Sequence, residues 1–227
     1  GVNAAYQVSR IALFGDARYQ YLDYDDVETS TGTTINNDDR DRGVGTAGGR
    51  IGYEIIPNYL AFFSGEYNNR HYIEGLDDSG INRDSQGYDV AVGTQFRLSG
   101  ITRGEVSVGY QQQFYEDAQL EDISGFSFAL GVTWFASELT TVDFSGARTI
   151  EETTIPGAAG YLNSTIRVDV AHELMRNLIL TGGLGFANSD YQGVDRNDYQ
   201  FDGSIDAKYL IDRNFYVGAG YEFRMRE

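Results

Sequence analysis

The hydrophobic pattern of residues 125–136 alternates between two classes of side chain. The large apolar class comprises Phe126, Phe128, Leu130, Val132 and Trp134, and the residues between them are small or mildly polar. Because successive side chains of a strand point to opposite faces, the pattern predicts a β-strand with one wide apolar face and one small, uncharged face. Its length of about twelve residues is close to the ~9–11 that a tilted strand needs to cross a bilayer. We therefore expect these large side chains to face lipid.

The same alternation recurs along the whole chain. The predicted strands cover residues 3–8, 11–24, 43–55, 59–72, 86–98, 104–117, 125–136, 140–151, 161–174, 178–191, 199–211 and the residues from 215 onward. In the strand 161–174, for example, Leu162 and Ile166 share the apolar face, and Arg167 and Asp169 share the polar face. Short turns near residues 10, 57, 101, 138, 176 and 213 alternate with longer polar loops such as residues 25–42 and 73–85. This layout predicts an all-β fold, a transmembrane antiparallel up-and-down β-barrel with about 12 strands in this chain.

Two other all-β architectures fit the pattern less well. A β-propeller needs four short strands in each repeat, whereas each repeat here holds two long ones. Soluble sandwiches do not keep short and long connections in strict alternation. Helical periodicity and the ~18-residue apolar run of a membrane helix are both missing. We therefore expect residues 1–227 to form a single outer-membrane β-barrel domain.

The polar parity of the strands is expected to line the inside of the barrel. The candidate pore-lining residues are Arg50, Glu54, Glu66, Arg70, Asp89, Arg97, Glu105, Asp143, Arg167, Asp169, Asp202, Asp206 and Lys208. Mixed charges of this kind can hydrate a pore and set its selectivity. The alternative is a packed interior without conduction, in which Arg50, Arg97 and Arg167 pair with facing carboxylates. Both remain open because a barrel of about twelve strands lies between the ~8 that fill with side chains and the ~16 that leave a channel.

Composition and charge narrow the range of functions. The chain has 34 acidic and 17 basic residues, a net charge of −17 and no cysteine. An acidic chain does not favour binding of nucleic acid through its phosphates, which requires a basic face. Much of the acidic charge lies in the long loops, where it is expected to repel anions and mildly favour cations at the mouth of a pore.

The residues offer little for catalysis or for a metal site. The two histidines, His71 and His172, both fall on the apolar, outward parity, so we predict no catalytic site and no enzyme activity. The acidic pairs Asp25-Asp26, Asp38-Asp39 and Asp77-Asp78 carry the oxygen ligands that divalent cations prefer. We interpret these pairs as solvated loop tips and predict no bound metal or cofactor.

Several segments resemble the porin-2 family of outer-membrane β-barrels. They are residues 9–14 (SRIALF), 175–178 (MRNL) and 212–221 (DRNFYVGAGY), in which a turn with Arg or Asn leads into an apolar, aromatic strand. The chain departs from outer-membrane barrels at its last residues, FRMRE, because such barrels usually finish on a terminal aromatic residue. We therefore expect a chain cut before its last strands, with 1 to 4 more strands in the complete barrel.

The resemblance implies a protein of the Gram-negative bacterial outer membrane, in contact with outer-membrane lipid. Some members of the family are linked to exopolysaccharide secretion. The expected function is therefore a porin-like channel that passes a hydrophilic solute or an exported polysaccharide, with secretion-complex subunits as possible partners. The alternative is a structural or anchoring barrel that holds a partner complex without conduction. The sequence leaves the oligomeric state open.

The inside–outside assignment can be tested by placing a charge on each face of one strand. Val92 has the apolar parity and Gln95 the polar parity. Val92→Arg is expected to destabilise the protein by roughly 2–4 kcal/mol, because a charge near the bilayer midplane is costly. Gln95→Arg should be tolerated. The measurement is the free energy of folding into lipid vesicles, and equal effects of the two substitutions would show that the assignment is wrong.

Overall fold

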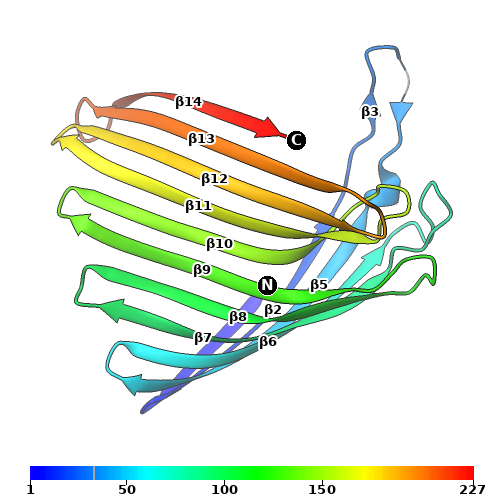
Figure 1. Cartoon of the computed structure of the whole chain (residues 1–227), viewed down its shortest axis with the longest axis horizontal. Coiled ribbons are helices and arrows are strands. Elements are labelled where there is room, and N and C mark those ends of the chain that lie inside the picture. Colours follow the sequence, from blue (N-terminus) through cyan, green and yellow to red (C-terminus); the bar gives the residue numbers. More distant parts are fainter. Residues whose placement is uncertain (33) are drawn as a thin grey trace.

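A computed structural model describes residues 1–32 and 34–227, which form a twelve-stranded antiparallel sheet and a small hairpin (Figure 1). The strands of the main sheet are β1 (Val2–Val8), β2 (Ile11–Leu22), β5 (Arg42–Ile56), β6 (Tyr59–Tyr72), β7 (Ser85–Leu98), β8 (Thr102–Tyr115), β9 (Ile123–Ser137), β10 (Thr140–Glu152), β11 (Gly160–Met175), β12 (Leu178–Gln192), β13 (Asn197–Leu210) and β14 (Tyr216–Arg226). Each strand pairs with the next one along the chain. The predicted all-β, up-and-down order of twelve strands is therefore confirmed.

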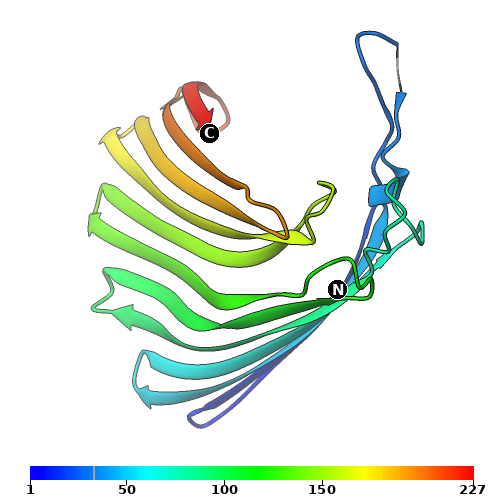
Figure 2. The same cartoon turned by 45° about the vertical axis from the view of Figure 1, so that its right-hand side comes forward.

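The twelve strands do not close into a barrel in this structure. β1 forms its ladder with β2 and β14 forms its ladder with β13, so the two edges of the twelve-stranded sheet are not paired with each other. Figures 1 and 2 show a strongly curved sheet with β14 at one edge and β1 at the other. Backbone groups cannot stay unpaired in hydrocarbon, so both edges require partner strands within a membrane.

The long loop after β2 holds more structure than its polar sequence predicts. It forms the two-residue strands β3 (Val27–Glu28) and β4 (Thr34–Ile35), which pair as a hairpin, and the 3-10 helix η1 (Asp38–Arg40). The hairpin projects from the end of the sheet that carries the long loops, which we call the loop end (Figure 2). Residue 33 of the predicted loop lies outside the described residues. Local contacts order the base of the hairpin, because the Tyr24 N–H donates to Asp41 Oδ1 (2.8 Å) and the Arg40 guanidinium lies 4.4 Å from the Tyr24 ring.

Among the described residues, the structure contains no helix that could span a bilayer.

The sheet has two chemically different faces. The ion pair between Arg50 on β5 and Glu105 on β8 crosses two intervening strands, so these side chains lie on the concave face. On the opposite, convex face the large apolar residues are exposed, as the exposed fractions of Val92 (56%) and Leu184 (72%) show. A wide apolar surface of this kind is unusual for a protein in water and is typical of a surface that contacts a membrane or another protein.

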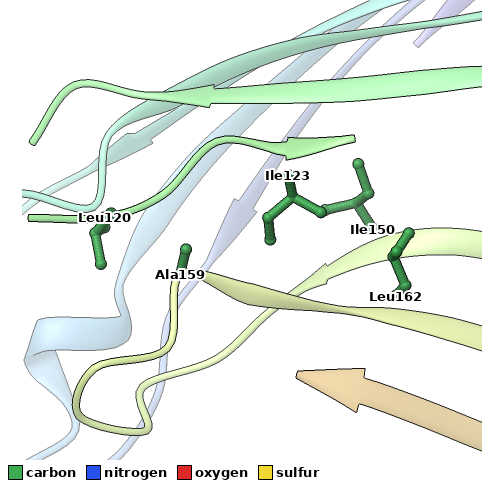
Figure 3. Packing of buried hydrophobic residues seen from close by; sticks show 5 residues of the cluster. All are labelled: Leu120, Ile123, Ile150, Ala159 and Leu162. Atoms are coloured by element: carbon green, nitrogen blue, oxygen red, sulfur yellow. The ribbon is translucent and has the colours of Figure 1, made fainter. Parts of the chain in front are cut away.

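The described apolar core lies at the loop end of the sheet and not between its two faces. Leu120, Ile123, Ile150, Ala159 and Leu162 form this cluster, which we call the loop-end core (Figure 3). Leu162 was expected on the outward face of its strand, but only 5% of its surface is exposed. The reason is that the β9–β10 ladder ends at Phe128 and Arg148, and beyond it the end of β10 lies over the concave side of β8 and β9.

A buried arginine holds two loops together beside this core. The Arg83 side chain, which is 1% exposed, donates from Nε to Asp77 Oδ2 (2.6 Å). Its Nη1 donates to the carbonyl oxygens of Thr153 (2.8 Å) and Ala158 (3.2 Å). The loop after β6 is therefore tied to the loop between β10 and β11. Because Arg83 is buried, loss of its carboxylate partner would leave a poorly compensated charge.

The pH dependence of this contact follows from the pKa of Asp77. Burial raises that pKa, but hydrogen bonds from the Ile81 and Ser79 N–H groups and from Arg83 outweigh burial, so the pKa is lowered. A carboxyl whose pKa is lowered by folding stabilises the folded state above its unfolded pKa. This contribution is lost as the pH falls through the folded pKa. The contact should therefore be intact at neutral pH and weaken below the ordinary value of 3.8.

Asp77→Asn is expected to weaken the local structure by about 1.5–3 kcal/mol at pH 7, because a hydrogen bond to a charged group is lost. The measurement is hydrogen exchange of residues 153–159, which should become faster than in the unsubstituted protein. Asp78→Asn is the matched control, since Asp78 is exposed. Equal exchange rates in both variants would contradict the role assigned to Asp77.

Candidate functional site on the concave face

The concave face contains a depression of about 380 Å³, in the lower range of small-molecule sites. Its charged lining includes the predicted residues Arg50, Glu66, Arg70, Asp89 and Glu105, together with Asp16 and Arg148. These side chains come from strands β2, β5, β6, β7, β8 and β10. All except Arg148 meet because directly opposite residues of an antiparallel ladder lie on the same face of the sheet. Arg148 is opposite Phe128 and lines the depression because the end of β10 lies over the concave side. The depression is therefore the candidate functional site.

Three carboxylates form a row across the floor of the depression. In the ladder register Asp16 lies opposite Gly48, Gly48 opposite Glu66, and Glu66 opposite Asp89. Asp16 extends over Gly48, because a Cβ atom at that position would lie 3.0 Å from Asp16 Oδ1. Among the described residues, no ion pair within 4 Å joins Asp16, Glu66 or Asp89 to a basic side chain. This carboxylate row therefore gives the depression a local excess of negative charge.

A second group of side chains, from β5, β6 and β8, lies at one side of the depression. Arg50 and Glu105 form a bidentate ion pair with two contacts of 2.8 Å, and the Arg50 guanidinium lies 4.0 Å from the centre of the Phe62 ring. Phe62 lies opposite Gly93, where a Cβ atom would collide with its ring. Because position 93 is glycine, the Phe62 ring has room to lie there and to contact the Arg50 guanidinium.

Another ion-pair network lies further along the sheet, on β11 and β13. Arg167 Nε lies 2.8 Å from Asp169 Oδ2, and the same guanidinium contacts Asp202 and the Ser204 hydroxyl (3.3 Å). Gly185, which lies between Arg167 and Asp202 in the ladder, leaves room for this contact because a Cβ atom there would collide with the Asp202 carboxylate. Of the three arginines named for a packed interior, Arg50 and Arg167 are paired with carboxylates. Arg97 has no ion pair in the described part of the chain.

The loop end of the depression is covered by polar contacts that cross the concave face. Arg70 on β6 forms an ion pair with Glu152 on β10 and donates to the Ile150 carbonyl (3.2 Å). The Tyr72 hydroxyl also donates to Glu152 (2.6 Å). Arg70 is therefore engaged in a contact between strands rather than free to meet a solute.

The register places all the predicted pore-lining residues on the same face as Arg50. The remaining ones, which lie nearer the short turns or midway along the strands, are Glu54, Arg97, Asp143, Asp206 and Lys208. Asp143 accepts a hydrogen bond from the Thr133 hydroxyl (2.7 Å), and Lys208 Nζ lies 4.3 Å from the centre of the Tyr216 ring. That this face lines a conducting pore remains a prediction.

The predicted lipid-facing residues of β9 lie on the convex side. Phe126 and Trp134 are 52% and 43% exposed, whereas Phe128, Leu130 and Val132 are half-buried. The rings of Phe126 and Phe128 are stacked with their centroids 6.1 Å apart. Contact of these residues with lipid also remains a prediction.

The two histidines lie on the convex parity, outside the depression. His71 Nδ1 is 2.6 Å from Asp84 Oδ2 and His172 Nδ1 is 2.9 Å from the Thr140 hydroxyl. Within the residues that the structure describes, no three His, Cys, Asp or Glu side chains are grouped so that they could hold a metal ion.

Besides Asp16, Phe62 and Arg148, four further residues of the concave side were not among the predicted site residues. Tyr72, Arg83, Gln111 and Glu152 lie at the loop end, where they connect strands that are far apart in the sequence. Gln111 begins a run of three glutamines, residues 111–113, on a strand that otherwise alternates regularly. That run is the signal in the sequence that marks this region as unusual.

The chain matches a known protein family over almost its whole length. A family model described as "Putative beta-barrel porin 2" matches residues 2–227. The chain belongs to this family of porin-like β-barrels. Family membership supports an outer-membrane β-barrel and channel as the coarse description of this protein. No curated protein matches the chain.

Two solved structures match almost the whole chain at low similarity. The Pseudomonas putida toluene transporter TodX is 10% identical with a TM-score of 0.44, over 99% of this chain and 80% of TodX. The CymD monoaromatic hydrocarbon channel is 11% identical with a TM-score of 0.39, over 99% of this chain and 77% of CymD. At these TM-scores the similarity supports no conclusion about the cargo of this protein.

The packing around Arg50 gives a test of the depression wall. Gly93→Ala is expected to destabilise the porin-like barrel by about 1–3 kcal/mol, because the new methyl group overpacks the wall against Phe62 and the Val106 carbonyl, 2.5 Å away. Gly131→Ala should be nearly neutral, since a Cβ atom there meets nothing within 4 Å. The measurement is urea-induced unfolding from lipid vesicles. A neutral Gly93→Ala would contradict the packing described here.

Proposed function

We propose that this porin-like barrel is an outer-membrane channel for hydrophilic solutes, with a preference for neutral or cationic over anionic ones. The observation that carries the proposal is the carboxylate row of Asp16, Glu66 and Asp89 in the depression of the concave face. Carboxylates arranged along a pore wall favour cations. A cleft of one sign between low-dielectric walls also focuses the potential. The acidic loops add to this effect at the mouth.

The cargo that we propose within this class is an exported, neutral or weakly charged polysaccharide. The uncharged part of the depression is rich in hydroxyl and amide groups, among them Ser64, Asn68, Ser107 and Ser127. Such groups exchange hydrogen bonds with sugar hydroxyls as readily as with water. The ion pairs Arg50–Glu105 and Arg167–Asp202 keep long side chains against the wall, which leaves space for a chain-like solute.

The second candidate function is a structural or anchoring barrel that holds a partner complex. The Arg70–Glu152 contact that covers the loop end of the depression favours it, because this contact reduces free space on the concave face. The two functions differ in one measurable property. A channel conducts ions in a planar bilayer, and an anchoring barrel with a filled interior does not.

The channel proposal is tested by neutralising the carboxylate row in the full-length protein. The triple variant Asp16→Asn, Glu66→Gln, Asp89→Asn is expected to reduce the preference for potassium over chloride by about twofold or more, since the fixed charges that favour cations are removed. The reversal potential in a salt gradient measures this preference. The matched control replaces the loop residues Asp25, Asp26 and Asp38 by Asn, and its effect on selectivity should be smaller.

Absence of conductance in the unsubstituted full-length protein would refute the channel and favour the anchoring barrel. Conductance with equal selectivity changes in both triple variants would refute the role of the carboxylate row.

A further inference from the structure

The ladder between β9 and β10 stops before either strand ends. The last paired residues are Phe128 and Arg148, yet β9 begins at Ile123 and β10 continues to Glu152. We use the term seam for residues 123–127 of β9 and 149–152 of β10. These two segments are extended but are not paired with each other. Continuing the same register would place Phe126 opposite Ile150 and Ser124 opposite Glu152.

Side chains from other strands occupy the hydrogen-bonding groups that ladder pairing would use. Gln111 on β8 accepts from the Ile150 N–H (3.1 Å) and donates to the Arg148 carbonyl (3.1 Å). It also lies 3.5 Å from the Phe126 carbonyl, so its amide stands between the two strands of the seam. Gln111 is 6% exposed, which makes these hydrogen bonds well protected from water.

Contacts with β6, with the loop after β6 and with the loop-end core hold the end of β10 on the concave side. Arg70 and Tyr72 of β6 bind Glu152, and Arg83 binds the carbonyls of Thr153 and Ala158. The loop-end core adds apolar contact, since Ile150 packs with Ile123, which is 1% exposed (Figure 3). These contacts place the end of β10 over the depression, where it is not paired with β9 as part of the sheet.

The hydrophobic pattern of β10 and β11 fits a second arrangement as well. Ile150 and Leu162 are directly opposite in the β10–β11 ladder and have the parity of the convex, apolar face. If the seam were paired, Ile150 would lie beside Phe126 and both residues would continue the apolar convex surface. The same two side chains are thus suitable for the loop-end core and for the outer wall. A segment with two compatible packings can act as a two-state element.

We propose that the seam is a gate for the channel. In the observed state the seam is parted, and the end of β10 with residues 153–159 covers the loop end of the concave face. Pairing of the seam moves the end of β10 into the wall, releases Gln111 and uncovers the depression. The consequence for conduction rests on the proposed channel function, whereas the movement of the seam does not.

The proposal is tested with a disulfide across the seam, because the chain has no cysteine of its own. Phe126 is exposed on the convex face and Ile150 is buried on the concave side, so the variant Phe126→Cys, Ile150→Cys can form its bond only when the seam pairs. Val132→Cys, Phe144→Cys is the matched control, because these residues are directly opposite in the existing ladder and, like Phe126 and Ile150, have the parity of the convex face. Both variants are oxidised as the full-length protein in lipid vesicles.

We expect disulfide formation in both variants. Adding Gln111→Leu should accelerate it in the seam variant about fivefold, the shift expected from losing the net contribution of one hydrogen-bonding group. Gln95→Leu is the control, because Gln95 lies on the same face of the sheet but is exposed. In planar bilayers, the oxidised seam variant should show persistent opening that a reducing agent reverses.

The possible outcomes separate the gate from the channel. No disulfide in the seam variant, with complete formation in the Val132 and Phe144 control, would overturn the proposal. Disulfide formation without a change in an existing conductance would overturn the gate. Disulfide formation in a protein that does not conduct in either redox state supports the movement of the seam and refutes the proposed channel.

Discussion

Backbone hydrogen bonding is the constraint on which the rest of this structure depends. A strand in hydrocarbon has no water with which to pair its N–H and C=O groups, so each strand needs a neighbour on both sides. The up-and-down order meets this requirement along most of the sheet. The exceptions are the outer edges of β1 and β14 and the seam between β9 and β10. At the seam, side chains such as Gln111 replace the missing ladder.

The charges of the concave face follow from a second requirement, which is that charged groups within a barrel be paired or hydrated. Arg50 and Arg167 meet it through facing carboxylates. Gly185, opposite Arg167, and Gly93, opposite Phe62, provide the space. The carboxylate row of Asp16, Glu66 and Asp89 remains without an ion pair in the described residues. The concave face therefore combines neutralised ion pairs with the acidic carboxylate row.

The loop end connects these two features. Arg70, Tyr72 and Arg83 bring β6 and the loop after it into contact with the end of β10. The same contacts that bury Ile150 and Leu162 also cover the depression at this end. A small core fixed by hydrogen bonds to backbone carbonyls is easier to rearrange than the long ladders beside it, because few apolar groups change their environment. Conformational change in this domain is therefore expected at the loop end.

The sequence by itself determined the strands, their order and the face of the side chains along the regular ladders. The direction of a side chain in an extended strand is a local property, so the alternation around Phe126 or Val92 was enough to assign the convex face, and the parity of Arg50, Asp89 and Arg167 the concave one. Only the tertiary structure decided which charges are paired and where the β9–β10 ladder ends. Residues such as Arg70 and Glu152 lie 82 positions apart, and their contact depends on the curvature accumulated over the intervening strands. No local pattern encodes that curvature, which is why the burial of Leu162 and the contacts of Gln111 could not be predicted.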